Sequence, residues 1–353
     1  MSQDQTHDHH ERPAVVYRQP SGGSPAVNGC LPGLLSFFLK IAVICIVMAG
    51  CFSMLGYLFH GDAGFEVTEK HVSGPDKATD KIAVITLSGV IVGDEEGSFI
   101  KQLNAAETDP KVKAVVLRID SPGGTVSGSD YYHHKIQQFK ANKNVPVVVS
   151  MGSMATSGGY YLSVTGQEIF AERTTTTGSI GVIASLYDFS ELCDKIGLHS
   201  NPVTSGPMKS MGDPTRKMTP EEKEVFQQLI DDMFLRFKEV VHEGRPQLTP
   251  AKIEELATGQ VYTALQAVDN GLVDKIGFVE DAVSRAGELA NLSAGSYKTV
   301  KYVLPKTAMD YLLGSKSQEV RPSAMLSPEL ANNLVTPRFY YIFPRAVPIV
   351  GGK

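Results

Sequence analysis

The sequence has little cysteine and no excess of positive charge. Of its 353 residues only four are cysteines, and the formal net charge is −5 at pH 7. Cys30, Cys45 and Cys51 lie in or beside an apolar run, so Cys193 is alone in the rest of the chain. A single cysteine cannot form an internal disulfide, and no pair of cysteines has zinc-finger spacing. Because no basic stripe is present either, nucleic-acid binding is not expected.

Charge is also missing from one long stretch near the N-terminus. Residues 41–59 contain no charged residue and are rich in Ile, Val, Leu, Met and Phe. With the apolar residues before Lys40 the run is long enough to cross a bilayer. We therefore expect a transmembrane helix over residues 34–60, after a disordered polar leader over residues 1–33. A cleaved signal peptide is the alternative, which the long leader and the lack of a small-residue cleavage site disfavour.

The rest of the chain alternates between strand and helix patterns. Residues 61–80 read as a polar linker, and residues 81–290 predict an α/β domain with mostly parallel strands. Prolines interrupt the remaining extension, residues 291–353. The strands that we expect are Ile82–Leu87, Ala114–Ile119, Pro146–Ser150, Glu168–Ala171, Ile180–Ile183 and His199–Val203. The helices that we expect are Ser98–Glu107, Val126–Phe139, Thr219–His242, Ile253–Ala257, Thr263–Asn270 and Phe278–Ala290.

One stretch, residues 147–161, combines the signals of a buried strand and a tight turn. Val147–Val149 are β-branched, and Ser157 stands directly before Gly158 and Gly159. This pattern predicts a serine at a strand-to-helix turn, next to the free amide of Gly158, which could bind an oxyanion. Ser157 is thus a candidate nucleophile. The alternative is that it only caps the helix, as most serines in such positions do.

A nucleophilic serine needs a base, and histidine is the usual one. The candidate histidines are His133, His134, His199 and His242, and none lies in a recognisable triad setting. We expect His133 and His134 on the surface of a charged helix. Lysine is the other base for this chemistry, provided that burial keeps its amine neutral. Lys209 lies in a loop with few charges around it and is the candidate, although an ordinary surface lysine would fit equally well.

A second oxyanion donor is expected from the glycine pair that follows a buried strand, Gly123 and Gly124 in the motif Asp120–Gly124. Glycines there let backbone amides approach a ligand closely, but a simple tight turn would also explain them.

Four motifs in order give the chain a resemblance to the signal peptide peptidase A family of membrane-bound serine proteases (peptidase family S49), in its short single-domain form. The motifs are Asp120–Gly124, Ala155–Tyr161, Thr177–Val182 and Ser205–Lys209. The resemblance covers about residues 82–290 and implies a crotonase/Clp-protease-like fold, a ββα superhelix.

The resemblance also implies roles for individual residues. Ser157 would be the nucleophile and Lys209 the general base of a Ser/Lys dyad. Gly158 and the Gly123-Gly124 pair would form the oxyanion hole, and the Ser179 hydroxyl would orient the lysine amine. Short members are expected to assemble into homo-oligomeric rings or domes, in which the serine of one subunit meets the lysine of its neighbour.

We therefore expect a membrane-anchored serine endopeptidase that hydrolyses extended apolar peptides, such as remnant signal peptides, without metal or cofactor. It would be a single-pass protein of the bacterial inner membrane with an extracytoplasmic catalytic domain. The alternatives are a crotonase-type acyl-CoA enzyme and a non-catalytic membrane-tethered scaffold. One apolar patch, Phe339–Phe343, is expected to be a docked terminal strand or an extended segment that occupies a peptide groove.

Overall fold

The structure, a computed structural model, describes residues 40–48, 50, 67–305 and 339–342. Residues 40–48 and 50 are helical, and within the described parts of the chain no helix is both long enough and apolar enough to span a membrane. The expected leader, most of the expected transmembrane segment and most of the C-terminal extension lie outside the described residues. Those domain boundaries therefore stay predictions.

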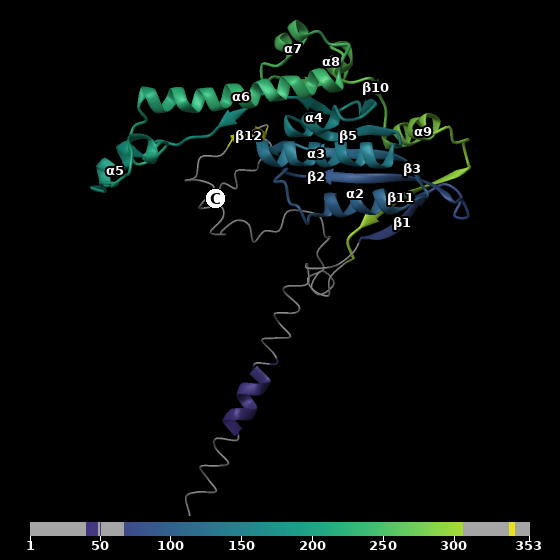
Figure 1. Cartoon of the computed structure of the whole chain (residues 1–353), viewed down its shortest axis with the longest axis horizontal. Coiled ribbons are helices and arrows are strands. Elements are labelled where there is room, and N and C mark those ends of the chain that lie inside the picture. The colour runs from purple at the N-terminus through teal and green to yellow at the C-terminus, as the bar shows by residue number, and fades with distance from the viewer. Residues whose placement is uncertain (1–39, 49, 51–66, 306–338, 343–353) are drawn as a thin grey trace, which may run out of the picture. The chain divides into compact units, whose positions relative to one another are not determined.

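The centre of the fold is a sheet of mostly parallel strands, as the alternating pattern predicts (Figure 1). In the described chain its order is β1-β11-β2-β3-β5-β6-β10, with β7 paired to β5 and β9 paired to β7. Only β1 and β9 run antiparallel to their partners. The bounds are β1 (Thr68–Ser73), β2 (Asp80–Ser88), β3 (Val112–Ser121), β5 (Val147–Thr156), β6 (Glu168–Ala171), β7 (Thr176–Gly178), β9 (Val261–Thr263), β10 (Lys275–Ile276) and β11 (Tyr297–Val303).

Helices cover both faces of this sheet. The bounds are α2 (Ser98–Thr108), α3 (Val126–Lys143), α4 (Gly158–Ser163), α5 (Ser190–Ile196), the 3-10 turn η1 (Pro207–Ser210), α6 (Pro220–Gly244), α7 (Pro250–Leu256), α8 (Ala264–Asp269) and α9 (Val279–Leu289). In β2, Ala83 and Ile85 belong to a core shared with α2, α3 and α4, whereas Ile82 and Val84 belong to a core shared with α9. Successive side chains of a strand point to opposite faces, so one strand can serve both cores.

A second, small sheet lies beside the first. It joins β4 (Gly123–Thr125), β12 (Phe339–Ile342) and β8 (Ile183–Ala184), with β12 in the middle. Both of its pairings are antiparallel. A four-residue strand from the far end of the chain thus lies between two segments that are close to the candidate site.

Three sequence expectations about local structure are wrong. The expected strand Ile180–Ile183 is replaced by β7 and β8 on either side of a non-strand segment, and His199–Val203 forms no strand. His133, expected on the surface, is buried against the ring of Tyr161. The start of α6 is confirmed, because the Thr219 hydroxyl accepts from the Glu222 amide in a capping box.

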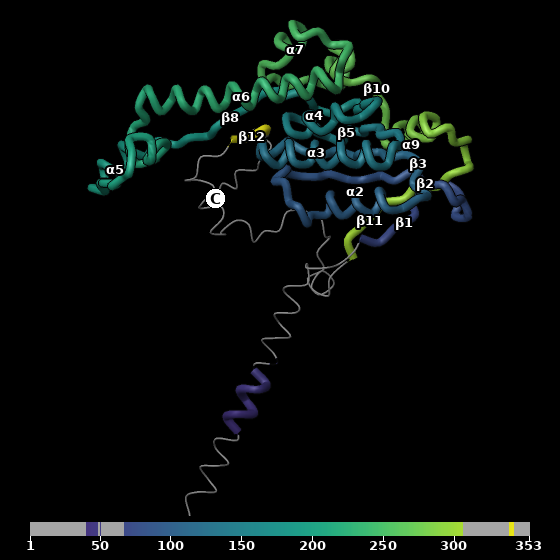
Figure 2. The backbone as a smooth tube through the Cα atoms, viewed as in Figure 1, coloured from purple at the N-terminus to yellow at the C-terminus, as the bar shows by residue number. Residues whose placement is uncertain are grey.

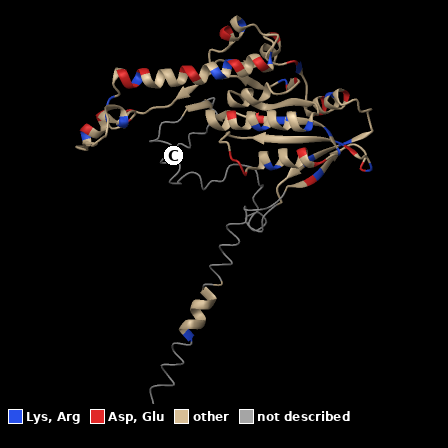
Figure 3. Cartoon of the chain, in the orientation of Figure 1, with Lys and Arg blue, Asp and Glu red and all other residues tan. Residues whose placement is uncertain are grey.

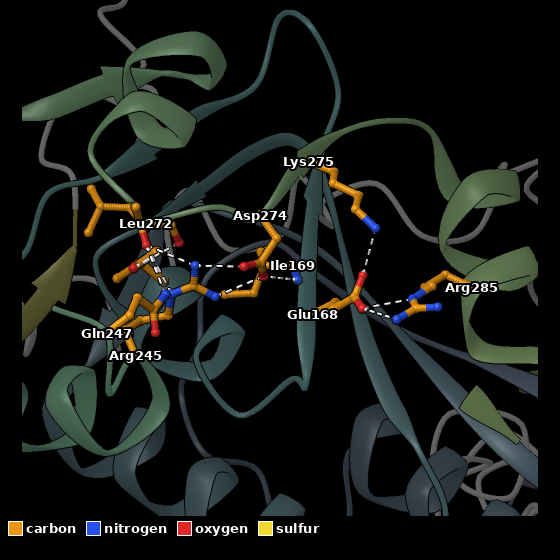
Figure 4. Close-up of polar contacts among 10 residues, drawn as sticks. Glu168, Ile169, Arg245, Gln247, Leu272, Asp274, Lys275 and Arg285 are labelled. Atoms are coloured by element: carbon orange, nitrogen blue, oxygen red, sulfur yellow. Dashed lines mark hydrogen bonds and ion pairs between the residues drawn. The ribbon is translucent and has the colours of Figure 1, made fainter. Parts of the chain in front are cut away.

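Ion pairs fix the edge of the sheet beneath the C-terminal end of α6 (Figure 4). The guanidinium of Arg245, 4% exposed, binds both carboxylate oxygens of Asp274 at 2.8 Å and also the Gly271 carbonyl. Asp274 in turn accepts from the Ile169 amide at 2.7 Å. Nearby, Glu168 accepts from Arg285 and Lys275. These contacts join α6, α9 and β10 to the strand β6.

The chain leaves the body of the fold after β8 and returns along α6 (Figure 2). We call residues 185–225 the arm; they include α5, η1 and the start of α6, and α5 lies at the end of α6 that is away from α4. Acidic and basic residues both occur along α6 (Figure 3). The arm also exposes large apolar side chains, namely Tyr187, Phe189, Leu192, Ile196, Leu198, Val203 and Met208.

Candidate active site

Ser157 lies at the strand-to-helix turn that its sequence context predicts, between β5 and α4. Its backbone has φ 51° and ψ −113°, a strained conformation for a residue with a side chain, and it is only 1% exposed. Its amide donates to the Gly178 carbonyl at 2.7 Å, and its carbonyl accepts from the Tyr161 amide at 2.8 Å. The Ser157 hydroxyl makes no capping hydrogen bond to α4. The interpretation of Ser157 as a simple helix cap is therefore not supported.

The glycine turn after β3 lies against Ser157. The Ser121 hydroxyl holds this turn, because it accepts from the Gly123 amide at 3.1 Å and donates to the Gly89 carbonyl at 2.6 Å. Gly123 has φ +99°, and a Cβ at this position would lie 2.8 Å from the Gly158 nitrogen. Only glycine therefore lets the two backbones meet, which brings the expected oxyanion residues together.

Ser179 joins the same cluster from the other side. Strand β7 pairs with the end of β5, and the last paired residues are Thr156 and Gly178. The next residue on each strand is Ser157 and Ser179, so these two serines are neighbours in the register. Ser179 is buried, has φ 53° and donates its amide to the Gln260 carbonyl at 2.7 Å. Two serines with left-handed backbones therefore lie side by side at the end of the sheet.

The strand β12 passes directly over this cluster. Its register with β4 is Tyr340 to Thr125, Tyr341 to Gly124 and Ile342 to Gly123. The Tyr341 carbonyl oxygen occupies the space that a Cβ on Gly123 would need, and it lies 3.1 Å from where a Cβ on Gly158 would be. The carbonyl of an extended chain thus approaches both candidate oxyanion residues, and β12 is docked as a strand between β4 and β8, a placement that both expectations for this patch share.

The Tyr341 side chain fills an aromatic pocket. Its ring stacks on Tyr161, with centroids 5.2 Å apart, and meets Phe237 at 4.7 Å. Its hydroxyl donates to the Met233 carbonyl at 2.7 Å, while burial raises the pKa of Tyr341, so that the hydroxyl keeps its proton. The Tyr161 hydroxyl donates to Asp130 at 2.6 Å. Beside these rings is a cavity of about 530 Å³, lined by Val92, Thr125, Val126, Ser127, Asp130, Met233, Arg236, Phe339 and Tyr341.

Lys209 lies elsewhere in the chain, in η1 of the arm. It is exposed rather than turned into an apolar pocket of its own chain, and its amine has no hydrogen bond or ion pair among the described residues. The structure therefore brings together Ser157, Gly158, Gly123, Gly124 and Ser179, but it shows no contact between this group and the Lys209 amine.

The aromatic pocket is the part of the site that sequence reasoning missed. Tyr161 lies within the stretch that points to Ser157, yet nothing local distinguishes it from an ordinary core residue. Met233 and Phe237 lie on one stripe of α6, which indicates packing but not a partner. The signal that could have found the pocket is the patch Phe339–Phe343, because an isolated aromatic segment between prolines needs a complementary surface.

Comparisons with known proteins identify the family of this chain. The family model of peptidase family S49 matches residues 139–293, and that of Clp protease matches residues 73–179. The chain is 36% identical to "Protease 4" of Salmonella typhi over 72% of its own length and 41% of that protein. It is 37% identical to "Putative protease slr0021" of Synechocystis sp., over 67% of this chain and 84% of that protein.

A third relative carries the name of the family that the motifs resemble. The chain is 36% identical to "Putative signal peptide peptidase SppA" of Enterococcus faecium, over 64% of this chain and 67% of that protein. The fold is a Clp-protease-like α/β fold with a mixed sheet. The chain spans less than half of the Salmonella protein but two thirds or more of the other two. The chain therefore belongs to the signal peptide peptidase A family, peptidase family S49.

Proposed function

We propose that this protein is a serine endopeptidase in which Ser157 is the nucleophile and Lys209 is the general base. The observation that carries the proposal is the approach of the Tyr341 carbonyl to Gly123 and Gly158, directly beside the strained, uncapped Ser157. This arrangement resembles a peptide carbonyl held next to a nucleophile and two backbone donors.

The proposed reaction assigns a role to each of these residues. The neutral amine of Lys209 takes the proton of the Ser157 hydroxyl as its oxygen attacks the scissile carbonyl. The amide of Gly158 and the Gly123-Gly124 turn stabilise the negative oxygen of the tetrahedral intermediate. Lys209 then gives the proton to the leaving amine, and a water molecule hydrolyses the acyl-enzyme. Ser179, which is next to Ser157 in register, would orient the amine through its hydroxyl.

The substrates that fit are extended apolar peptides. Strand β12 lies between β4 and β8 with its backbone paired on both sides, so a substrate chain would bind by adding a strand in the same place. The apolar run at residues 41–59 supports a membrane anchor, which would concentrate membrane-derived peptides such as remnant signal peptides near the site. We place the protein in the bacterial inner membrane with the catalytic domain outside the cytoplasm.

The lysine is proposed to come from a neighbouring copy of the chain. The arm carries Lys209 together with several exposed apolar side chains, among them Leu192 and Ile196. Exposed apolar surface of this extent favours a protein–protein contact. Docking the arm of one subunit on the body of the next would bury this surface and bring Lys209 to Ser157, which favours a ring or a dome.

Single substitutions test the catalytic roles. Ser157→Ala and Lys209→Ala should each reduce peptide cleavage by several orders of magnitude while the thermal unfolding midpoint stays unchanged. Lys111→Ala is the control, since Lys111 is an exposed lysine just before β3, outside the arm, and it should keep full activity. Full turnover by either active-site variant would contradict the proposal.

Mixing the two inactive variants tests where the lysine comes from. Subunits with Ser157→Ala retain Lys209, and subunits with Lys209→Ala retain Ser157. If neighbouring subunits share a site, co-assembled variants should regain part of the activity. If each chain completes its own site, mixing should restore nothing.

The two alternative functions predict different results. A serine-directed covalent probe should label Ser157, which a crotonase-type acyl-CoA enzyme or a non-catalytic scaffold would not require. The family that the chain belongs to is a peptidase family, which favours peptide hydrolysis over either alternative.

A further inference from the structure

The turn that carries Lys209 is not fixed by burial. Within η1 and the residues around it, the Lys209 amide donates to the Gly206 carbonyl at 3.1 Å and the Met211 amide to the Met208 carbonyl at 3.1 Å. These bonds shape the turn locally, but none of the four residues of η1 is buried. A general base must be held within a fraction of an ångström of its place, so something else has to fix this turn.

Arg216 connects the Lys209 turn to the start of α6. One nitrogen of its guanidinium donates to the Ser210 carbonyl at 2.7 Å and to the Ser210 hydroxyl at 3.2 Å, at the residue directly after Lys209. The same guanidinium binds both carboxylate oxygens of Glu222, with 3.0 Å between Nη1 and Oε2. A paired guanidinium–carboxylate contact of this kind fixes direction as well as distance.

Glu222, the partner of Arg216, is itself held firmly in place by α6. It is 2% exposed and lies in the first turn of α6, where it takes part in the capping box. The Thr219 amide donates to Glu222 Oε2 at 3.1 Å, and the Glu222 amide donates to the Thr219 hydroxyl at 3.2 Å. The hydrogen bond from Arg216 holds the pKa of Glu222 below its usual range, so the pair stays charged at neutral pH. The far end of α6 is anchored in the core through Phe237 and Val240.

A continuous set of contacts therefore runs from the residue beside Lys209, through Arg216 and Glu222, to a 25-residue helix. We propose that Arg216 and Glu222 are positioning residues that hold the Lys209 turn against the start of α6 and so set where the amine lies during catalysis. The proposal rests on the role of Lys209 as general base. Neither residue needs to touch the substrate, and neither belongs to the four motifs that identify the family.

Kinetics of Arg216 variants in the full-length protein test the proposal. Arg216→Ala should lower kcat by about 10- to 100-fold, because a displacement of about 1 Å can cost that much. KM should stay unchanged, because the peptide groove is formed by β4, β8 and the pocket around Tyr161. Arg216→Lys, which keeps a charge but cannot bind both partners, should recover part of kcat, and Glu222→Gln should resemble Arg216→Ala.

The matched control is Arg285→Ala. Arg285 has the same exposed fraction as Arg216, 32%, and also binds a carboxylate, but it joins α9 to β6 and does not contact the arm. Its loss should leave kcat and KM unchanged. If Arg216→Ala folds and turns over like wild type, or if Arg216→Lys and Arg285→Ala lose activity equally, the positioning role is wrong.

The outcomes also separate this proposal from the proposed function. If Lys209→Ala is fully active, the catalytic role of Lys209 fails and the Arg216 proposal fails with it. If Lys209→Ala is inactive while every Arg216 and Glu222 variant keeps wild-type kcat, only the positioning role fails.

Discussion

Gly123 and Gly158 meet backbone to backbone under the Tyr341 carbonyl, and a Cβ on Gly123 would lie 2.8 Å from the Gly158 nitrogen. The contact joins the start of β4 to the start of α4, two elements that are separated by more than thirty residues in the sequence. The Tyr341 carbonyl oxygen lies only 2.0 Å from where that Cβ would be, so it occupies the space that the missing side chain leaves.

Gly123→Ala should therefore inactivate the proposed peptidase. The new methyl group would occupy the position of the Tyr341 carbonyl oxygen and displace the Gly158 amide, and losing one of the proposed oxyanion donors would cost about 100-fold or more in kcat. Peptide turnover by the purified variant measures the effect. Gly295→Ala is the control, because Gly295 has φ +79° with open space around it and so tests backbone strain alone. Equal activity of the two variants would show that the space above Gly123 does not hold the scissile carbonyl.

Tyr341→Ala should release the C-terminal strand from the groove. Tyr341 is fully buried and its loss removes the stack on Tyr161 and the hydrogen bond to Met233. A groove that its own chain no longer fills is more available to an added peptide, so KM should fall by roughly 10-fold with kcat unchanged. Steady-state kinetics with a short peptide give both constants.

Tyr340→Ala is the control for this change, because Tyr340 precedes Tyr341 in the same strand but is only half-buried. It should lower KM much less. Deletion of the chain beyond Asn333 should match Tyr341→Ala. Unchanged KM in both the deletion and the Tyr341 variant would mean that β12 does not compete with substrate.

Buried His133 should make stability depend on pH. Burial, with Arg236 as the next cause, lowers the pKa of His133 to about 4, against 6.5 for an exposed histidine. Between these two values the unfolded chain binds a proton that the folded chain does not, so stability falls as pH drops from about 6.5 to about 4. The full loss is on the order of 3 kcal/mol. The ionisable groups whose electrostatic influence reaches the ring are Arg236, Asp130, Lys140 and His134.

His133→Gln should remove most of this loss. Urea unfolding at pH 4.5 and pH 7 measures it, and the difference between the two pH values should be smaller in the variant than in wild type. His134→Gln changes an exposed neighbour and should behave like wild type. An identical pH dependence in all three proteins would exclude His133 as the source.

Asp274→Asn should destabilise the fold strongly. It leaves the Arg245 guanidinium, which is almost fully buried, without its carboxylate, and breaking such a pair costs about 3 kcal/mol or more. Glu254→Gln breaks the exposed pair with Lys238 and should cost less than about 1 kcal/mol. Urea unfolding of both variants gives the comparison. Similar losses would show that the buried pair contributes no more than a surface one.

Much of the site could be predicted because its signals are local. The β-branched run before Ser157, the glycines after it and the glycine pair at Gly123 each act within a few residues, and so does the capping box that begins α6. These patterns depend on backbone conformation, which neighbouring residues largely determine. The expected strand at Ile180–Ile183 was wrong because pairing with β5 and β12, not local propensity, decides where β7 and β8 lie.

By itself the sequence determined the α/β class of the fold, the turn at Ser157, the glycine turn and the family, but it predicted no strand at β1 or β11 and misplaced the strands expected at residues 180–183 and 199–203. Only the tertiary structure decided that Tyr341 lies over Gly123, that Tyr161 and Phe237 form its pocket, and that Arg216 joins the Lys209 turn to α6. The reason is distance along the chain. Residues far apart in sequence meet only when sheet register and helix packing bring them together, and no local pattern carries that information.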